Sequence, residues 1–184
     1  MIPNAYYDNI FEIDYQKLKN IGIKNIFFDI DNTIIPYKVT EVDKKTIKLF
    51  KNLKKDFNVF LYSNSRRKRT MHVSKQLDVG AYYFSMKPLK RNYKKILNIF
   101  KREECIFVGD ILLTDVLGAK RNKLRVIYVN RLNEKEPITT KFWRLIEKYY
   151  LKKYNKQGIF KINEFYDRLR NVWNLLIVWY NFIE

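Results

Sequence analysis

Two aspartates stand two residues apart in a run that is otherwise apolar, "IFFDIDNTII" at residues 26–35. A carboxylate rarely enters such a run without a partner or a task, because burying it unpaired costs free energy. Asp29 closes the apolar stretch and Asp31 follows it, so both side chains can point toward one place at the end of a strand. An isolated pair of this kind is most often a turn or capping feature, so its meaning depends on other residues.

Further polar residues follow other apolar runs. Ser63 ends one such run and Lys87 follows a second. Asp110 ends a third, with Asp115 about one helical turn later. Because the ligand site of an open α/β sheet lies beyond the carboxyl ends of its strands, we expect these side chains to meet the two aspartates at one edge.

The charges at this edge call for a cation. Four carboxylates converging with one lysine repel one another strongly when they are partly buried. A divalent ion bound by oxygen relieves that repulsion, and Mg²⁺ prefers one or two carboxylates together with waters and a phosphate oxygen. The predicted cofactor is therefore Mg²⁺, and the predicted ligands are Asp29, Asp31, Asp110 and Asp115.

A site of this kind can position and stabilise phosphoryl transfer. Asp29 is the predicted nucleophile, because a carboxylate can form an aspartyl-phosphate intermediate. Asp31 is the predicted general acid for the leaving oxygen and then the base for water. Thr33 and Ser63 are expected to hydrogen-bond phosphate oxygens or to brace the loop, and Asn64 and Lys87 complete the predicted phosphate-binding set.

The elements that must position these residues follow a strand–helix rhythm. Strand-like apolar runs lie at 25–30, 57–63, 81–85, 105–110 and 125–130, and helix-like segments lie at 41–56, 65–78, 90–102 and 112–122. Most of the apolar runs are continuous rather than alternating, which is typical of a sheet covered on both faces. The sequence predicts an α/β fold with a doubly wound, mainly parallel sheet.

The C-terminal quarter has a different character. Residues 1–135 are predicted to form one domain, and 136–184 to form amphipathic helices that dock on the core or associate with a membrane. "NEKEP" (133–137) is the most linker-like stretch, and helical spacing of apolar residues covers 139–154 and 161–184. Tryptophan and tyrosine in the last segment are residue types favoured at membrane interfaces.

Four segments resemble, in order, the motifs of the haloacid dehalogenase (HAD) superfamily phosphatases: "FFDIDNTII", "LYSNS", "MKP" and "VGDILLTDVLGAKRN". Over nearly all of residues 1–140, the sequence is also similar to the YqeG-like group of subfamily IIIA. This group is related to mitochondrial phosphatidylglycerophosphate phosphatases. The resemblance implies a Rossmann-like HAD fold and Mg²⁺-dependent phosphomonoester hydrolysis.

The resemblance also implies individual roles. Hydrolysis would proceed through Asp29, with Asp31 as acid and base and its backbone carbonyl on the metal. Ser63 and Lys87 would bind the phosphate and Asp110 the metal, while the second acid of the fourth motif, Asp115, would either support the metal or brace the site.

The spacing also limits the kind of substrate. The intervals from Asp31 to Ser63 and from Ser63 to Lys87 are too short for the cap domains with which HAD-like enzymes enclose small metabolites. A capless site cannot exclude water by closing a lid over a small substrate. It fits a phosphate carried on a lipid surface, a protein or a nucleic-acid end.

The charge balance favours an anionic partner. The chain has 37 Lys and Arg against 19 Asp and Glu, a formal net charge of +18, although a general lysine bias would give the same total. "RRKR" (66–69) and "KPLKRNYKK" (87–95) lie on the predicted catalytic rim. Near an anionic membrane each basic residue contributes about 1 kcal/mol.

The leading hypothesis is dephosphorylation of phosphatidylglycerophosphate to phosphatidylglycerol at a membrane surface. The alternatives are the same chemistry on a phosphorylated nucleic-acid end or protein, or a nucleic-acid- or ribosome-binding module with a vestigial site. Competition between lipid vesicles and phosphorylated oligonucleotides would separate the two enzymatic alternatives, and RNA binding that survives high salt without phosphatase turnover would favour the binding module.

Cysteine and apolar patterns indicate the compartment. Cys105 is the only cysteine, so an intrachain disulfide is excluded and a reducing, cytoplasmic setting is expected. With one histidine, the chain cannot form a Cys/His zinc site. No apolar run reaches the length of about 18 residues that a spanning helix needs, so the predicted location is cytoplasmic and peripheral on the inner face of the membrane.

Overall fold

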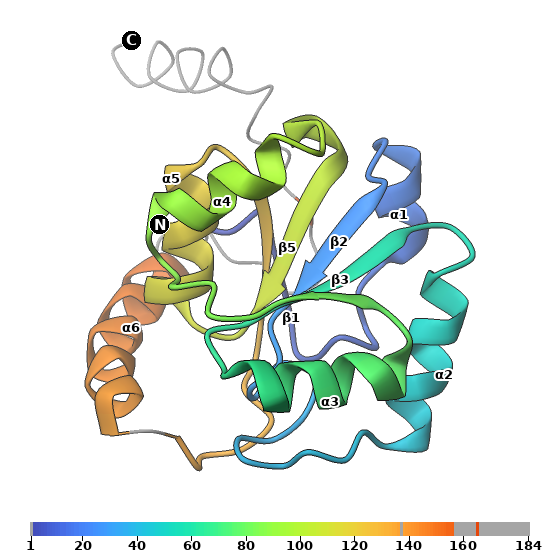
Figure 1. Ribbon diagram of the computed structural model, residues 1–184. Helices are drawn as coiled ribbons and strands as arrows, with labels where there is room; N and C mark the ends of the chain where they lie inside the picture. The colour runs from blue at the N-terminus through green and yellow to red at the C-terminus, as the bar shows by residue number, and fades with distance from the viewer. Residues whose placement is uncertain (1, 137, 157–164, 166–184) are drawn as a thin grey trace, which may run out of the picture.

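The computed structural model of the protein describes residues 2–136, 138–156 and 165. Within these residues, one sheet has the strand order β1-β6-β5-β2-β3-β4, and all neighbouring strands are parallel (Figure 1). The strands are β1 (Ala5–Tyr7), β2 (Asn25–Phe28), β3 (Asn58–Tyr62), β4 (Gly80–Tyr82), β5 (Cys105–Gly109) and β6 (Arg125–Val129).

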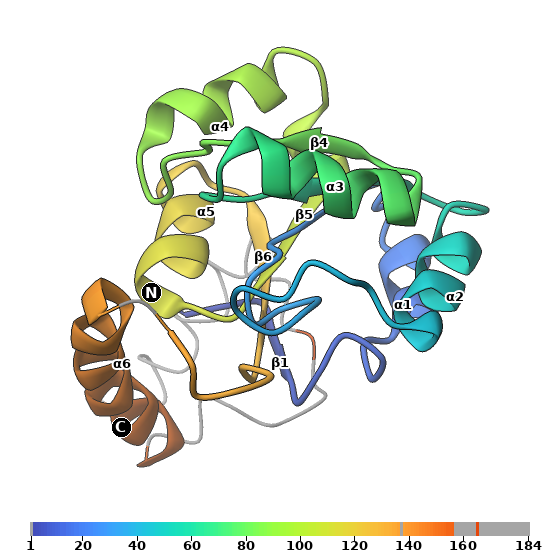
Figure 2. The same cartoon turned by 60° about the horizontal axis from the view of Figure 1, so that its bottom comes forward.

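Helices cover both faces of this sheet. They are α1 (Tyr15–Asn20), α2 (Lys44–Leu53), α3 (Arg67–Leu77), α4 (Lys90–Leu97), α5 (Leu117–Arg121) and α6 (Ile138–Lys156), with a 3₁₀ turn η1 (Arg102–Glu104) and a π-helical turn η2 (Leu112–Val116). Figure 2 shows α1 and α2 on one side of the sheet and α5 and α6 on the other.

The continuous apolar runs are explained by this double cover. In β2, Ile26 and Phe28 belong to a core that includes residues of α1, α2 and α3. Phe27, between them, belongs to a second core with residues of α4, α5 and α6. There it stacks on Phe107 of β5 with ring centroids 4.7 Å apart. Since both faces of the central strands are buried, neither face can be polar, and alternation disappears.

The prediction of a doubly wound parallel α/β sheet is confirmed, with differences at the elements' ends. In the segment predicted as a helix over 90–102, helix α4 ends at Leu97, and the non-helical residues 98–101 separate it from η1. Strand β1 and helix α1 were not predicted. Strand β1 is three residues long and pairs with β6, Ala5 lying opposite Ile127. The helix predicted over 161–184 lies outside the described residues except for Phe165, which packs against the first core.

The two intervals that could hold a cap domain do not hold one. Between Asp31 and Ser63 the chain forms a loop, α2 and β3, and between Ser63 and Lys87 it forms α3 and β4. The absence of a cap over this described part of the chain is as predicted. Among the residues that the structure describes, none of the helices combines the length and hydropathy needed to cross a bilayer.

The topology fixes where a ligand can bind. Strands β2 and β5 are neighbours, and the chain order runs outward from them in opposite directions, to β3 and β4 on one side and to β6 on the other. Such a reversal leaves a crevice beyond the carboxyl ends of the two strands. Asp29 and Asp110 are the residues that follow these two strands.

Candidate active site

Three buried carboxylates meet at the crevice between β2 and β5. Asp29, Asp110 and Asp115 each offer one oxygen atom, and these atoms lie within 4.8 Å of one another. We call these residues the aspartate triad. Asp29 and Asp110 arrive there because each directly follows a buried strand.

Asp115 reaches the triad through an unusual local turn. The π-helical turn η2 brings Asp115 back over the end of β5, and Asp115 Oδ2 accepts a hydrogen bond of 3.0 Å from the Ile111 backbone N–H. A Cβ atom on Gly109 would lie 2.6 Å from the Cβ of Asp115, closer than two non-bonded carbon atoms can approach. Glycine at 109 therefore makes room for the second acid of the "GDILLTD" segment.

Lys87 is the cation shared by two members of the triad. Its Nζ donates to Asp29 Oδ1 and to Asp115 Oδ1, each at 2.6 Å, and all three side chains are buried. Burial alone would lower the pKa of the lysine amine, but the charges of Asp115 and Asp29 raise it above the ordinary value. Lys87 is therefore positively charged in the site.

Asp29 carries the clearest sign of uncompensated negative charge. Burial, together with the charges of Asp115 and Asp31, raises the pKa of Asp29 to about 7 against the opposing effect of Lys87. Burial, with the charges of Asp115 and Asp29, also raises the pKa of Asp110 well above its ordinary value, despite Arg144. The carboxylates here outnumber the cations that contact them, so a divalent metal ion fits the donor set.

Asp31 lines the same pocket as the triad, but its carboxylate is held elsewhere. Asp31 Oδ2 accepts hydrogen bonds from Ser65 Oγ at 2.6 Å and from Arg69 Nη1 at 3.0 Å. Asn32, next in the chain, adopts a left-handed conformation with φ of 59°, and its backbone N–H donates to Ile35 O at 2.7 Å. This tight loop, which follows the carboxyl end of β2, places Asp31 at the pocket.

The predicted phosphate-binding residues divide into two groups. Ser63 and Asn64 line the pocket, and Asn64 Oδ1 accepts from the Lys87 backbone N–H at 2.8 Å, which fixes the segment that carries the lysine. Thr33 Oγ1 instead donates to Asp110 Oδ1 at 3.3 Å within the buried part of the site. Thr33 thus braces a triad member in this structure.

A buried ionic cluster from α6 is the part of the site that sequence reasoning missed. Arg144 donates to both the carboxylate and the backbone carbonyl of Asp110. It also contacts Glu147 Oε2 at 2.6 Å and Glu136 Oε1 at 2.6 Å. Glu147 Oε1 in turn accepts from the Leu112 backbone N–H at 2.7 Å. We call Arg144, Glu136 and Glu147 the α6 cluster.

The α6 cluster leaves a faint signal in the sequence. Arg144, Glu147, Leu151 and Tyr154 lie on one helical stripe, and the last two are apolar residues that pack against or within the protein. The stripe's charged members therefore face the core as well. Glu136 belongs to the stretch predicted as linker-like, yet its side chain is only 2% exposed.

The pocket above the triad has a volume of about 510 Å³. Its polar floor is formed by Asp29, Asp31, Ser63, Lys87 and Asp110, and an apolar wall by Ile111, Leu113, Leu117 and Trp143. A site with this floor can hold a phosphate group between a buried lysine and a cation bound by the triad.

Comparisons with known proteins agree with this geometry. The family model of the haloacid dehalogenase-like hydrolases matches residues 37–122. Over 160 residues the chain is 30% identical to a Bacillus subtilis (strain 168) protein described as "Probable phosphatase YqeG", covering 85% of this chain and 93% of that protein. The chain belongs to the haloacid dehalogenase-like hydrolase family. The predictions of HAD membership, of a YqeG-like relative and of a HAD-type phosphatase are confirmed.

Solved structures share the HAD fold. The magnesium-bound HAD-hydrolase YfnB from Bacillus subtilis is similar with a TM-score of 0.51 and 13% identity, over 62% of this chain and 90% of that one. A HAD-like family hydrolase from Porphyromonas gingivalis is similar with a TM-score of 0.50 and 14% identity, over 67% and 98%. At these identities the likeness concerns the fold.

Proposed function

We propose that this HAD phosphatase is a Mg²⁺-dependent phosphomonoesterase that acts through an aspartyl-phosphate on Asp29. The observation that carries the proposal is the aspartate triad with Lys87 at the topological switch point, where buried carboxylates exceed their cations. A magnesium ion held by Asp29, Asp110 and the Asp31 backbone, with Asp115 in support, would neutralise phosphate charge and polarise its oxygens. YfnB, a protein of the same fold, is described as bound to magnesium.

The chain's own residues supply the remaining steps. A carboxylate oxygen of Asp29 attacks phosphorus, and the bond between phosphorus and the leaving oxygen breaks. Asp31 gives a proton to that oxygen, then takes one from the water that cleaves the phosphorus–Asp29 bond and releases phosphate. Lys87 and Ser63 bind the phosphate oxygens, while Asn64 holds Lys87 in place.

We propose an anionic phospholipid, phosphatidylglycerophosphate, as the phosphate carrier. No cap stands between the described pocket and a large substrate, and the apolar wall of Leu113, Leu117 and Trp143 adjoins the polar floor. Exposed cations begin immediately beyond the pocket, at Arg66 and at Lys90. These features favour a charged headgroup on an apolar body. Peripheral attachment to the inner face of a cytoplasmic membrane belongs to the same proposal.

The division of labour within the chain is also proposed. Residues 1–135 form the catalytic core, and 136–184 form helices that dock on it or contact a membrane. The contacts of Arg144 and Glu147 with Asp110 and Leu112 support docking for the α6 part.

The experiment is phosphate release from phosphatidylglycerophosphate in mixed micelles with Mg²⁺, by the full chain and by Asp29→Asn. We expect release by the wild type and a decrease of at least about a thousandfold in the variant. Equal release by both, or none by the wild type, contradicts the proposal. Oligonucleotides with 3′- or 5′-phosphates, assayed in parallel, test the alternative carriers.

A further inference from the structure

Exposed apolar side chains gather on the loop that carries Lys87. Phe84, Met86 and Leu89 are 53%, 57% and 50% exposed, and Tyr83 beside them is exposed as well. Single exposed apolar residues are common on protein surfaces, but several in one short segment are characteristic of a surface that another molecule covers. We call residues 83–89 the β4–α4 loop.

Successive side chains of the β4–α4 loop face in turn the active site and the solvent. Ser85 and Lys87 are buried, and Ser85 Oγ donates to Asn64 Oδ1 at 3.0 Å. The intervening Phe84 and Met86 point outward. Backbone hydrogen bonds hold the segment to the core, among them Ser85 N to Ser63 O at 3.0 Å and Phe84 N to Ser65 O at 3.2 Å. The outward apolar side chains are therefore displayed on an anchored backbone.

The outward placement of Phe84 and Met86 requires an unfavourable backbone conformation. Phe84 and Met86 adopt left-handed backbone conformations, with φ of 46° and 49°. Residues with a bulky side chain rarely occupy this region, because the β-carbon approaches the carbonyl oxygen. Such strain persists only where surrounding contacts impose it, and it concentrates at functional sites and ligand clamps. Here the imposed geometry keeps two apolar side chains out in solvent.

Positive charge surrounds the β4–α4 loop. Arg66, Arg67 and Lys68 are exposed at the start of α3, and the Arg67 guanidinium lies 5.7 Å from the centre of the Tyr83 ring. Exposed cations also begin α4, at Lys90 and Arg91. In the sequence from residue 63 to residue 101 the only acidic residue is Asp78, which lies at the other end of α3 and pairs with Lys54.

We propose that the β4–α4 loop docks on an anionic lipid bilayer, with Phe84, Met86 and Leu89 entering the interface and the flanking arginines and lysines contacting lipid headgroups. Apolar anchors combined with basic residues are the features that bind proteins to anionic membrane surfaces. A nucleic acid would neutralise the cations but would leave the aliphatic Met86 and Leu89 without an apolar environment. This inference deepens the proposed function, on which it rests for the substrate's location at the membrane.

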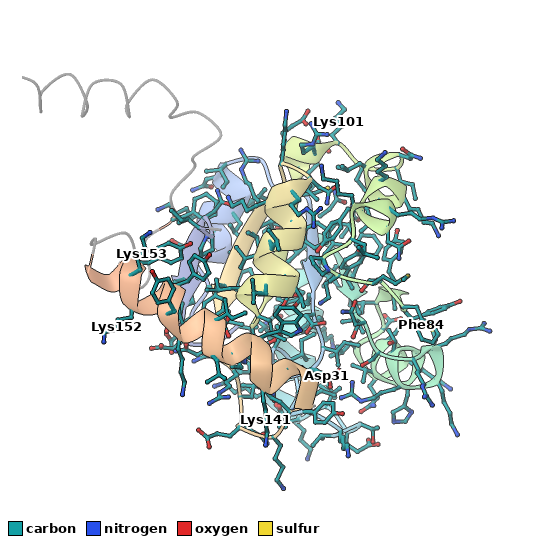
Figure 3. The ribbon with its side chains drawn as sticks, turned by 90° about the vertical axis from the view of Figure 1, so that its left-hand side faces the viewer. Asp31, Phe84, Lys101, Lys141, Lys152 and Lys153 are labelled. Carbon is teal, nitrogen blue, oxygen red and sulfur yellow. The ribbon has the colours of Figure 1, made fainter. Side chains whose placement is uncertain are left out.

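The geometry links docking to chemistry. Lys87 and Pro88 of the same loop line the pocket over the triad, so lipid seated against Phe84 and Met86 would lie next to the pocket mouth. Figure 3 shows Phe84 on the opposite side of the view from Lys152 and Lys153 near the end of α6. The loop is thus a docking surface separate from that end of α6.

The test is co-sedimentation of the full chain with phosphatidylglycerol vesicles and with neutral phosphatidylcholine vesicles, without Mg²⁺ or substrate. The variants are the double substitution Phe84→Ser with Met86→Ser and the matched control Ile99→Ser. Ile99 is apolar and 66% exposed, and it lies between α4 and β5, toward the amino ends of the strands and away from the carboxyl ends that carry the pocket.

We expect wild type and Ile99→Ser to bind phosphatidylglycerol vesicles alike and the double variant to bind at least about tenfold more weakly, because two apolar side chains leave the interface. Equal binding by the double variant, no binding by the wild type, or equal affinity for neutral vesicles overturns the proposal. So does binding to a phosphorylated oligonucleotide in preference to vesicles.

A second readout reports insertion without relying on the serine variants. Cys105 is buried and is the only cysteine, so Phe84→Cys and Ile99→Cys each provide one exposed site for an environment-sensitive dye. We expect the emission of the dye at position 84, and not at position 99, to shift to the blue on adding phosphatidylglycerol vesicles. An unchanged emission at position 84 contradicts insertion.

Asp29→Asn separates this proposal from the proposed function. That variant should bind vesicles like the wild type, because the buried Asp29 side chain is not part of the exposed apolar and basic surface that contacts lipid. Vesicle binding without any phosphatase activity in the wild type would leave docking standing and refute the catalytic proposal. Activity on micellar lipid with no vesicle binding would do the reverse.

Discussion

Replacing Arg144 by alanine tests how firmly α6 is built into the active site. Arg144 is buried and contacts three carboxylates, those of Asp110, Glu136 and Glu147. Burial alone would lower the pKa of Arg144, but the three acids raise it above its ordinary value. The substitution leaves the three acids in place with their shared cation removed.

The expected cost follows from that imbalance. Removing one partner of a buried ion pair typically costs about 3–5 kcal/mol, because the remaining charge stays buried and unpaired. With three acids affected, we expect the upper part of that range. For a chain of this size each kcal/mol corresponds to about 2–4 °C in melting temperature, so Arg144→Ala should melt about 10 °C or more below the wild type.

Chemical denaturation of the full chain measures the change in free energy of unfolding. The matched control is Lys24→Ala, since the Lys24 side chain is 65% exposed and its Nζ meets Glu104 Oε1 at 2.8 Å, away from the α6 cluster. Such a surface pair is worth about 0–1 kcal/mol, so the control should stay within about 1 kcal/mol of the wild type. A loss of less than about 1 kcal/mol for Arg144→Ala would refute the buried α6 cluster.

Further predictions concern the triad. Gly109→Ala should displace Asp115, whose Cβ would lie 2.6 Å from the new methyl group; we expect about 1–3 kcal/mol of destabilisation and weaker Mg²⁺ binding by calorimetry, and unaltered binding would contradict this. Burial, with Asp115 and Asp31, raises the pKa of Asp29 to about 7, so the contribution of Asp29 to the stability of the metal-free fold falls as the pH rises from the ordinary value of 3.8 to about 7. Because a metal needs the ionised carboxylate, Mg²⁺ should raise the melting temperature more at about pH 8 than at about pH 6, and the opposite order would count against a metal at Asp29.

Much of the fold could be predicted because its signals are local. Strands such as β2 and β5 are buried on both faces, so their apolar runs stand out from the charged helices between them. Strand β1 gave no such signal. Its three residues carry two tyrosines and become a strand only because β6 offers a free edge for pairing.

The site was predictable to the extent that strand ends carry it. Asp29 and Asp110 follow directly from the topology, and Asp115 from its spacing to Asp110. Arg144 could not be predicted in the same way, because a charged residue in a mixed helix usually faces water. Its burial depends on Asp110, which comes from a distant part of the chain, as well as on the nearby Glu136 and Glu147.

Arg69 illustrates the same limit. Within "RRKR" it looked like its neighbours on a basic rim, yet its guanidinium contacts Asp31 at 2.9 Å while Arg66, Arg67 and Lys68 remain exposed. Which member of a basic cluster turns inward depends on the helix phase, and a cluster of four consecutive cations hides that phase.

The central claim is that a carboxylate oxygen of Asp29 attacks phosphorus. It is tested most directly by quenching the full chain during turnover with Mg²⁺ and phosphatidylglycerophosphate, reducing with borohydride, and mapping the product by mass spectrometry. Reduction of an aspartyl-phosphate converts that aspartate to homoserine, and we predict this conversion at Asp29 alone. Conversion at another residue, or turnover by Asp29→Asn at the wild-type rate, would contradict the account.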